Sequence, residues 1–551
     1  MHRPLLSLAA LLTGSALLSA LALTPAQSGA LGAPPVPTQN PITPEKAVLG
    51  KILYWEEQLS SDNSVSCGTC HVPSLGLTDG RSERHPGQLP NEPADDLFTS
   101  PGIIRRNVDL HMTPDATFDL SPQLTPRRTN DFIGALYQDE IFWDGRADDV
   151  FIDPETGLVS IPSGGALENQ ALQPILSEIE MGHEGRTWDD VRLKLETAVP
   201  MRLATDLTPD IVAALAADPT YPDLFDNAFG TPDITAERIG YAIATYERTL
   251  VPDQTPWDDF MNGNPAAMTQ DQIEGWNQFN GVANCHLCHT PPVFSDGDFH
   301  NTGLRHWSAD LGREGVTGDI ADRAAFKTPS LRGSGLRTSY FHTGGAPTFQ
   351  QVRSVYDAGG GLFVQFLDPL LVPLAGNPNV EWLKIFDFIG EALTDPRMAA
   401  ELPPFDRPTL YSERVPSRSN VFGNSAAGTS QAIPVISGVE QPAFPGNDRF
   451  ELGVFRALSN TPGALFISLN KGPGPSPGGI PFNVEQPFNQ VHWRLLAGTG
   501  VDDGWAAVPV PIPNTSTVIG RTFYAQWIVL DAGSPNGFGA ASKGAEFTIQ
   551  P

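Results

Sequence analysis

Amphipathic helical patterning is clearest in two stretches that each end shortly before a pair of cysteines. In residues 48–53 apolar side chains recur three and four positions apart, and residues 43–45 supply a capping threonine, a proline and an acid. Residues 272–279 show the same patterning before the second cysteine pair, and further helical periodicity runs through 236–250. We therefore expect this part of the chain to be mainly helical.

The pattern changes after residue 412, where short apolar runs alternate with clusters of Gly, Pro, Ser and Asn. Runs such as 450–454 and 523–530 have the length and the turn-rich boundaries of strands. Residues 417–551 are therefore expected to form an all-β, sandwich-like domain, so that the whole chain is mainly α with a C-terminal β domain. This stretch holds one histidine, His492, and no cluster of metal ligands, which favours an accessory or adhesion module over a catalytic one.

Two other stretches show little periodicity and are rich in turn-forming residues. Residues 81–126 contain many Pro, Asp, Thr and Arg, while 151–165 contain the runs D-P-E-T-G and P-S-G-G. Such composition predicts irregular surface excursions from the helical part of the chain.

The N-terminus carries the pattern of a secretory signal. Arg3 precedes an apolar run from Leu5 to Leu23, and small and turn-forming residues follow it. This order predicts a signal peptide over 1–30 and an exported protein that is periplasmic, extracellular or attached to the cell surface. A retained membrane anchor is the alternative, because the run is long enough to cross a bilayer. No later stretch approaches this apolar length, so the mature chain should have no stable membrane span.

The charge of the chain narrows the choice of partners. Acidic residues number 63 and basic residues 34, which gives a formal net charge of −29. Phosphate would be repelled, so a nucleic-acid partner is disfavoured, whereas a basic redox partner would be attracted. The acidity could equally serve solubility alone.

The spacing of the four cysteines indicates which kind of cofactor the chain binds. In an exported protein they would ordinarily suggest two disulfides, yet they fall in two copies of C-x-x-C-H, with none left over. Two cysteines at this spacing can hold one edge of a porphyrin through thioethers, and the histidine that follows can bind the iron. A zinc half-site or a redox C-x-x-C remains the alternative for a single copy. The motifs predict two covalent haem c groups, held by Cys67, Cys70 and His71 and by Cys285, Cys288 and His289.

The distance between the two motifs also indicates how the chain is divided. They are too far apart for a closely spaced multihaem array. We expect one cytochrome c-like domain over 40–255 and a second over 256–412, followed by the β domain.

Several ordered motifs across residues 40–412 resemble the bacterial di-haem cytochrome c peroxidase family, which includes MauG. The C-terminal domain lies outside this resemblance. The motifs are L-S-S-D at 59–62, F-W-D-G-R-A at 142–147, E-M-G at 180–182, F-S-D-G-D-F-H-N at 294–301, K-T-P-S-L-R at 327–332, Y-F-H at 340–342 and L-T-D-P-R at 393–397.

The resemblance implies different roles for the two haems. The first would be the site of peroxide reduction, and the second would store and deliver electrons. Glu180 matches a distal glutamate that shuttles protons during O–O cleavage, and Gln170 matches a glutamine beside it. Trp143 matches a tryptophan between the haems. The family also commonly holds one calcium ion between the two haem domains.

Tyr356 is a second point of comparison with the family. Peroxidases of the family have a distal methionine on the second haem at this place, whereas MauG has a tyrosine. A phenolate is a harder, anionic donor than a thioether, so it should stabilise ferric and higher-valent iron and lower the reduction potential. The alternative is a packed helix tyrosine whose hydroxyl is satisfied elsewhere.

The resemblance predicts a haem peroxidase of the cytochrome c peroxidase or MauG type. It would reduce hydrogen peroxide with electrons from a redox protein such as a small cytochrome or cupredoxin, or from a protein substrate. A non-enzymatic di-haem electron carrier is the alternative, and a cell-surface binding module with a redox accessory is a third reading. A homodimer is compatible with all three.

Overall fold

The computed structural model describes residues 31–86, 97–414, 421–473 and 476–551. The predicted signal peptide at 1–30 lies outside these described residues. Among the helices of the described ranges, none is long and apolar enough to cross a membrane.

The first part of the chain is a helical region built around the crossing of α1 (Pro44–Trp55) and α7 (Ala236–Glu247). The cap predicted for the first helix is present, because the Thr43 side chain accepts a hydrogen bond from the Lys46 amide. Both helices were predicted from periodicity and are confirmed. The other helices of this region are α2 (Cys67–Cys70), α3 (Ala166–Leu176), α4 (Trp188–Thr197), α5 (Pro209–Ala217) and α6 (Tyr221–Phe229), with 3-10 turns at Glu57–Leu59, Pro73–Leu75 and Ala135–Tyr137.

Short hairpins interrupt this helical region. They pair β1 (Glu83–Arg84) with β2 (Phe98–Thr99), β3 (Pro101–Ile104) with β4 (Pro122–Leu124), and β5 (Phe151–Ile152) with β6 (Val159–Ile161). The prediction that 81–126 is only a surface excursion is wrong. Ile103, Ile104, Leu120 and Leu124 are buried there, because this stretch packs between the helical region and the C-terminal strands.

The second helical region is built on the crossing of α9 (Gln270–Asn280) and α12 (Trp382–Asp387), and the helix predicted at 272–279 is confirmed. Its core is aromatic and includes Trp257, Trp276 and Phe388. The other elements are α8 (Pro256–Met261), β7 (Phe299–His300), α10 (Glu314–Thr317), β8 (Phe326–Lys327) and α11 (Phe349–Ala358), with 3-10 turns at Cys285–Leu287, Ile320–Asp322 and Ser334–Leu336 and a π-helical turn at Phe388–Ala392. The chain then returns to the first helical region, where α13 (Pro396–Ala399) and α14 (Tyr411–Arg414) pack.

The C-terminal part consists of two antiparallel sheets. One has the order β13-β12-β15-β17-β9, with β16 also paired to β15, and the other has the order β10-β11-β14. Side chains from both sheets, such as Leu452, Leu465 and Trp527, share one core. The strands are β9 (Val421–Phe422), β10 (Val435–Ser437), β11 (Glu451–Ala457), β12 (Pro462–Lys471), β13 (Val484–Leu495), β14 (Gly504–Pro509), β15 (Thr522–Leu530), β16 (Gly539–Ala541) and β17 (Gly544–Thr548).

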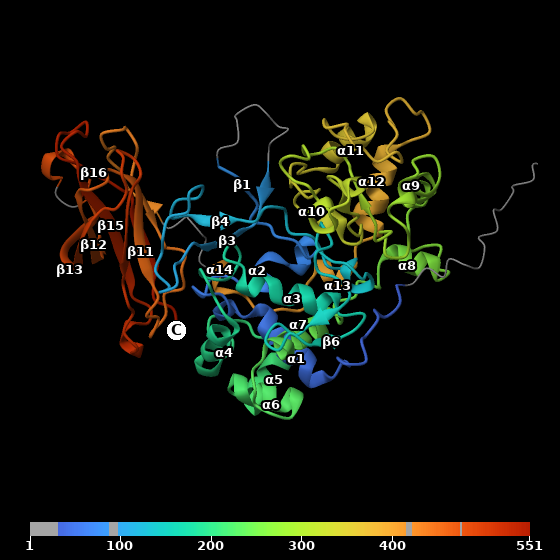
Figure 1. The fold of residues 1–551 in the computed structure, drawn as a ribbon, viewed down its shortest axis with the longest axis horizontal. Coiled ribbons are helices and arrows are strands. Elements are labelled where there is room, and N and C mark those ends of the chain that lie inside the picture. The colour runs from blue at the N-terminus through green and yellow to red at the C-terminus, as the bar shows by residue number, and fades with distance from the viewer. Residues whose placement is uncertain (1–30, 87–96, 415–420, 474–475) are drawn as a thin grey trace, which may run out of the picture.

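The three parts follow one another across the molecule (Figure 1). The C-terminal strands lie at one end, beside β3 and β4, and the second helical region lies toward the other end. The chain therefore combines helical regions with a sizeable C-terminal β portion.

Both helix crossings depend on a glycine. A Cβ at Gly50 would lie 1.9 Å from the Ala242 carbonyl oxygen, and a Cβ at Gly275 would lie 2.0 Å from the Lys384 carbonyl oxygen. Thus α1, which precedes the first C-x-x-C-H motif, is in direct backbone contact with α7. In the same way α9, which precedes the second motif, is in direct backbone contact with α12.

We expect Gly50→Ala to lower the free energy of unfolding by about 1–3 kcal/mol, because the added methyl group forces α1 and α7 apart. Alanine would otherwise favour the helix by about 1 kcal/mol. Thermal unfolding of the full-length protein, followed by circular dichroism, measures the effect. The control is Gly315→Ala in α10, where the nearest atom to a new Cβ is 3.8 Å away. Equal midpoints for the parent and Gly50→Ala would contradict the close crossing.

Candidate functional site

The first C-x-x-C-H motif faces a cavity in the first helical region. Ser66 caps α2 and exchanges hydrogen bonds with Thr69, so the motif begins as a single helical turn. Cys67, Cys70 and His71 all line the same cavity, called cavity 1 below.

The second motif faces a cavity of its own. Cys285, Cys288 and His289 line this cavity, called cavity 2 below, and the 3-10 turn Cys285–Leu287 supplies the helical turn. Its lining also includes Phe279 and Leu331, which gives it a largely apolar wall.

The two motif histidines are held in the same way. The Nδ1 atom of His71 donates to the Leu77 carbonyl oxygen at 3.0 Å, and that of His289 donates to the Phe294 carbonyl oxygen at 3.1 Å. Burial lowers the pKa of both imidazoles, so each is neutral at ordinary pH. A neutral ring that donates through Nδ1 presents the lone pair of Nε2 to a metal. Both sites therefore fit an iron ligand.

The cysteines do not resemble a reactive thiol pair. No disulfide joins any of the four, and burial raises the pKa of Cys67 and of Cys285 to about 12. A redox C-x-x-C depends on a populated thiolate, which these surroundings disfavour. Two thiols and a neutral imidazole on one wall of a cavity fit covalently attached haem.

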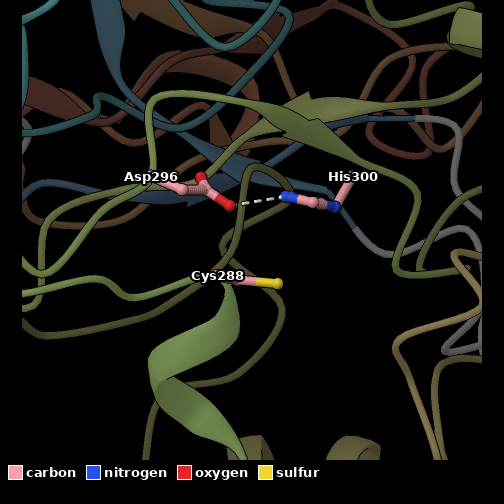
Figure 2. Close-up of side chains that lie close together, drawn as sticks. All are labelled: Cys288, Asp296 and His300. Atoms are coloured by element: carbon pink, nitrogen blue, oxygen red, sulfur yellow. Dashed lines mark hydrogen bonds and ion pairs between the residues drawn. The ribbon is translucent and has the colours of Figure 1, made fainter.

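Cys288 of the second motif forms a cluster of metal-ligand types with Asp296 and His300 (Figure 2). His300 is clamped between two carboxylates, with Nε2 2.9 Å from Asp296 and Nδ1 2.6 Å from Asp368. The bond to Asp296 is the main cause that raises the pKa of His300 to about 11, so the ring is an imidazolium without a free lone pair. A thioether to a haem would also engage the Cys288 sulfur. The cluster therefore ties β7 to the chain around residue 368 and does not resemble a metal site.

Gln170 and Glu180 line cavity 1 together with His71. Gln170 lies on α3, and Glu180 lies in the loop that follows this helix. Burial raises the pKa of Glu180, and the Arg146 charge and the Ser177 side chain oppose the shift. A carboxyl group with a raised pKa can accept and return a proton closer to neutral pH than an ordinary glutamate can.

Trp143 lines both cavities. Its indole is 8% exposed, and Nε1 donates to the Arg128 carbonyl oxygen at 2.7 Å. The ring meets His342 edge-on, with centroids 6.0 Å apart, and His342 in turn stacks on Phe326 at 3.6 Å. A continuous aromatic contact thus joins the walls of the two cavities.

Trp143 and His342 occupy matching positions in two similar turns. Each follows a phenylalanine with positive φ, which is 70° for Phe142 and 66° for Phe341. Each turn is closed by a β-bridge across the same number of residues, 141–147 in one region and 340–346 in the other. The two helical regions therefore bring equivalent residues together where they meet.

Tyr356 lies on α11 and lines cavity 2 with His289. Burial raises the pKa of its hydroxyl. Within the described part of the chain, no hydrogen bond satisfies this hydroxyl. A packed structural tyrosine would ordinarily have such a partner.

Glu247 is a site residue that the sequence gave no reason to select. It is buried at the end of α7 and lines cavity 1, and burial raises its pKa to about 8. Its Oε2 atom has no hydrogen-bond partner among the described residues. As one of 63 acidic residues it carries no local pattern that marks it.

Neither histidine of the 81–126 stretch lines either cavity. His85 bonds to Thr99 and to the Thr125 carbonyl oxygen, and His111 pairs with Glu451 of the C-terminal strands. Both rings are engaged in contacts within or around this stretch.

Comparison with known proteins agrees with the two-cavity arrangement. Residues 44–266 match the family described as di-haem cytochrome c peroxidase. The chain is 34% identical over 332 residues to the methylamine utilization protein MauG of Methylorubrum extorquens, which covers 59% of this chain and 72% of that protein. It is 28% identical to cytochrome c551 peroxidase of Nitrosomonas europaea, over 62% of this chain and 82% of that protein.

A solved structure of a MauG-like protein associated with microbial copper homeostasis is also similar, at 21% identity and a TM-score of 0.48, over 71% of this chain and 99% of that one. The sequence identity to MauG extends over most of that relative's length, and it shows that the chain belongs to the di-haem cytochrome c peroxidase family, which includes MauG.

Proposed function

We propose that the protein is a peroxidase-type oxidoreductase that reduces hydrogen peroxide in cavity 1 with electrons delivered through cavity 2. The observation that carries this proposal is the Glu180 carboxyl group, which shares cavity 1 with His71 and has a raised pKa. Cys67, Cys70 and His71 would hold the haem of this cavity, which when bound supplies the iron for the reaction.

Glu180 would move the proton that peroxide reduction requires. One peroxide oxygen loses a proton and the leaving oxygen gains one, so a single carboxylate can accept the proton and then return it. Burial suits this role because it brings the pKa of the acid closer to the working pH. Gln170, on α3 in the same cavity, can orient the substrate with its amide without competing for the proton.

Trp143 would carry electrons between the cavities. The indole lies in the wall of both, and the bond from Nε1 to the Arg128 carbonyl oxygen fixes its orientation. A packed aromatic ring at this place shortens the distance that an electron crosses through the protein.

Cavity 2 would hold the second haem through Cys285, Cys288 and His289, and Tyr356 would supply a further ligand to its iron. The unpartnered hydroxyl of Tyr356 in this cavity supports the assignment. An anionic oxygen donor lowers the reduction potential, which favours the MauG type of chemistry over receipt of electrons from a high-potential cytochrome.

We propose the domain division 40–255, 256–412 and 417–551, which the three main apolar cores support. Met398, Phe405 and Leu410 also join the first core, so the end of the second domain returns to the first. The two C-terminal sheets share one core, which supports a sandwich. We further propose that the protein is exported to the periplasm or cell surface. Its partner would be a small cytochrome, a cupredoxin or a protein substrate. One calcium ion would bind near Asn130, which lies in the wall of both cavities.

Replacing Glu180 with glutamine should slow the reaction with peroxide by about 10²- to 10⁴-fold, because the amide has the shape of the acid but cannot shuttle the proton. Stopped-flow mixing of the haem-loaded protein with peroxide measures the rate. The control is Glu178→Gln, an exposed acid two positions away. A Glu180→Gln rate equal to that of the parent would refute the assigned role.

The reaction rate should fall as the pH drops through the pKa of Glu180, because only the ionised carboxylate accepts a proton. Burial raises this pKa, so the fall should occur above the pH expected for an ordinary glutamate. Arg146→Gln removes a charge that favours the ionised form and should move the midpoint to higher pH. Arg192→Gln on α4 is the control, with a side chain 36% exposed compared with 41% for Arg146. If Arg146→Gln leaves the pH midpoint unchanged, Glu180 is not the group whose ionisation controls the rate.

Tyr356→Phe should change the absorption spectrum and the reduction potential of the second haem, because phenylalanine cannot coordinate iron. Tyr340→Phe is the matched control, since Tyr340 also lines cavity 2 but donates its hydroxyl to the Ser334 carbonyl oxygen. Electronic absorption spectra and redox titration of both variants provide the measurement. Identical spectra for the parent and Tyr356→Phe would exclude ligation by this residue.

A further inference from the structure

The loop that carries Glu180, residues 177–184, is held from one side by the hairpin β3–β4. A Cβ at Gly102 of β3 would lie 1.9 Å from the Ile179 carbonyl oxygen, so the strand backbone lies directly against the loop. The Ile103 amide donates to that same oxygen at 3.3 Å, and Gln123 of β4 donates to the Glu178 carbonyl oxygen at 2.6 Å. The position of this Glu180 loop therefore depends on the hairpin.

The residues between β3 and β4 are in turn held by the C-terminal strands. Ile104, Met112 and Leu120 form a buried cluster with Phe455 of β11. The Ser437 hydroxyl of β10 donates to the Leu120 carbonyl oxygen. The hairpin is thus packed between the Glu180 loop and the C-terminal β region, which comprises the described residues 421–473 and 476–551.

Arg106 by itself contacts both the Glu180 loop and the β region. Its carbonyl oxygen accepts a hydrogen bond from the Glu184 amide at 2.9 Å, at the end of the Glu180 loop. Its guanidinium donates to Gln441 at 2.6 Å and to Glu451 at 3.3 Å, both in the β region. The side chain is 1% exposed.

Glu451 is the centre of this contact on the β side. Besides Arg106, its carboxylate accepts the Met112 amide at 2.7 Å and contacts His111 Nδ1 at 2.8 Å. Asp62 also lies near the guanidinium, 4.0 Å from Nε, but Glu451 is the carboxylate within hydrogen-bond distance, so Arg106 should shift if Glu451 loses its charge.

A second contact from the β region leads to the same loop. Arg449 donates to the Ser61 carbonyl oxygen at 3.4 Å. The Ser61 hydroxyl accepts the His183 amide at 3.0 Å, and the Ser61 amide donates to the Met181 carbonyl oxygen at 2.8 Å. The β region therefore supports the residues that flank Glu180 on two sides.

We propose that Arg106 is a positioning residue through which the C-terminal β region fixes the Glu180 loop in cavity 1. The β region would then serve the reaction itself, as a brace for the distal acid, in addition to any role at the cell surface. The proposal rests on the role proposed above for Glu180.

The test compares the full-length, haem-loaded parent with Glu451→Gln, which removes the charge that holds Arg106 and keeps the side-chain volume. Hydrogen–deuterium exchange of peptides covering 177–184 reports the loop directly, because the Glu184 amide bonds to Arg106. Stopped-flow rates with peroxide and their pH dependence report the reaction. Asp531→Asn is the matched control, since Asp531 is a buried carboxylate of the same β region that bonds to Thr429 and Gly533, away from the hairpin.

We expect faster exchange at 177–184 in Glu451→Gln, with unchanged exchange at 270–280 in the second helical region. The rate with peroxide should fall on the order of ten- to a hundredfold, because small displacements of a catalytic group have effects of this size. The pH midpoint of the reaction should also shift, which a general loss of stability would not cause. Asp531→Asn should match the parent in all three measurements.

Parent-like exchange at 177–184 in a folded Glu451→Gln protein would overturn the brace, and so would equal loosening in Asp531→Asn. Faster exchange with a parent-like rate would support the brace and contradict the role proposed for Glu180. If Glu451→Gln does not fold, Gln441→Leu decides by the same measurements, because it removes one acceptor of Arg106 and keeps the carboxylate.

Discussion

Each motif histidine donates Nδ1–H to a backbone carbonyl, and this bond determines which ring nitrogen faces the cavity. The carbonyls belong to Leu77 and Phe294, which share the same left-handed backbone conformation, with φ of 58° and 59°. Only in this orientation does Nε2 face the cavity that the motif cysteines also line, so that the cysteines and the imidazole can hold the same group. The preceding helix and its glycine crossing hold the motif in place, so the packing of each helical region serves this single orientation.

The two cavities differ because of a few side chains placed on a shared framework. Cavity 1 receives the carboxyl groups of Glu180 and Glu247, and burial raises the pKa of both. Cavity 2 receives a tyrosine and an imidazolium that is already neutralised by two carboxylates. The first cavity is therefore suited to proton exchange, whereas the second offers a phenol oxygen and a paired imidazolium in place of these carboxyl groups.

Local sequence patterns predicted the helices before each motif and the cap at Thr43, because spacing and capping act over a few residues. The roles of Glu180, Gln170 and Tyr356 came from the family resemblance, since no local feature distinguishes them. The packing of 81–126 against the β region could not be predicted. Arg106 and Glu451 are 345 positions apart, and nothing in either neighbourhood identifies the other as its partner. Glu247 was missed for the same reason, because its burial is created by the fold.

The matching turns at Phe142 and Phe341 place unlike side chains at equivalent positions of the two helical regions. Both helical regions share this turn, a close helix crossing at a glycine, and a motif histidine bonded to a backbone carbonyl. At the matched position one region presents Trp143 and the other His342, so the aromatic contact between the cavities is an indole on one side and an imidazole on the other.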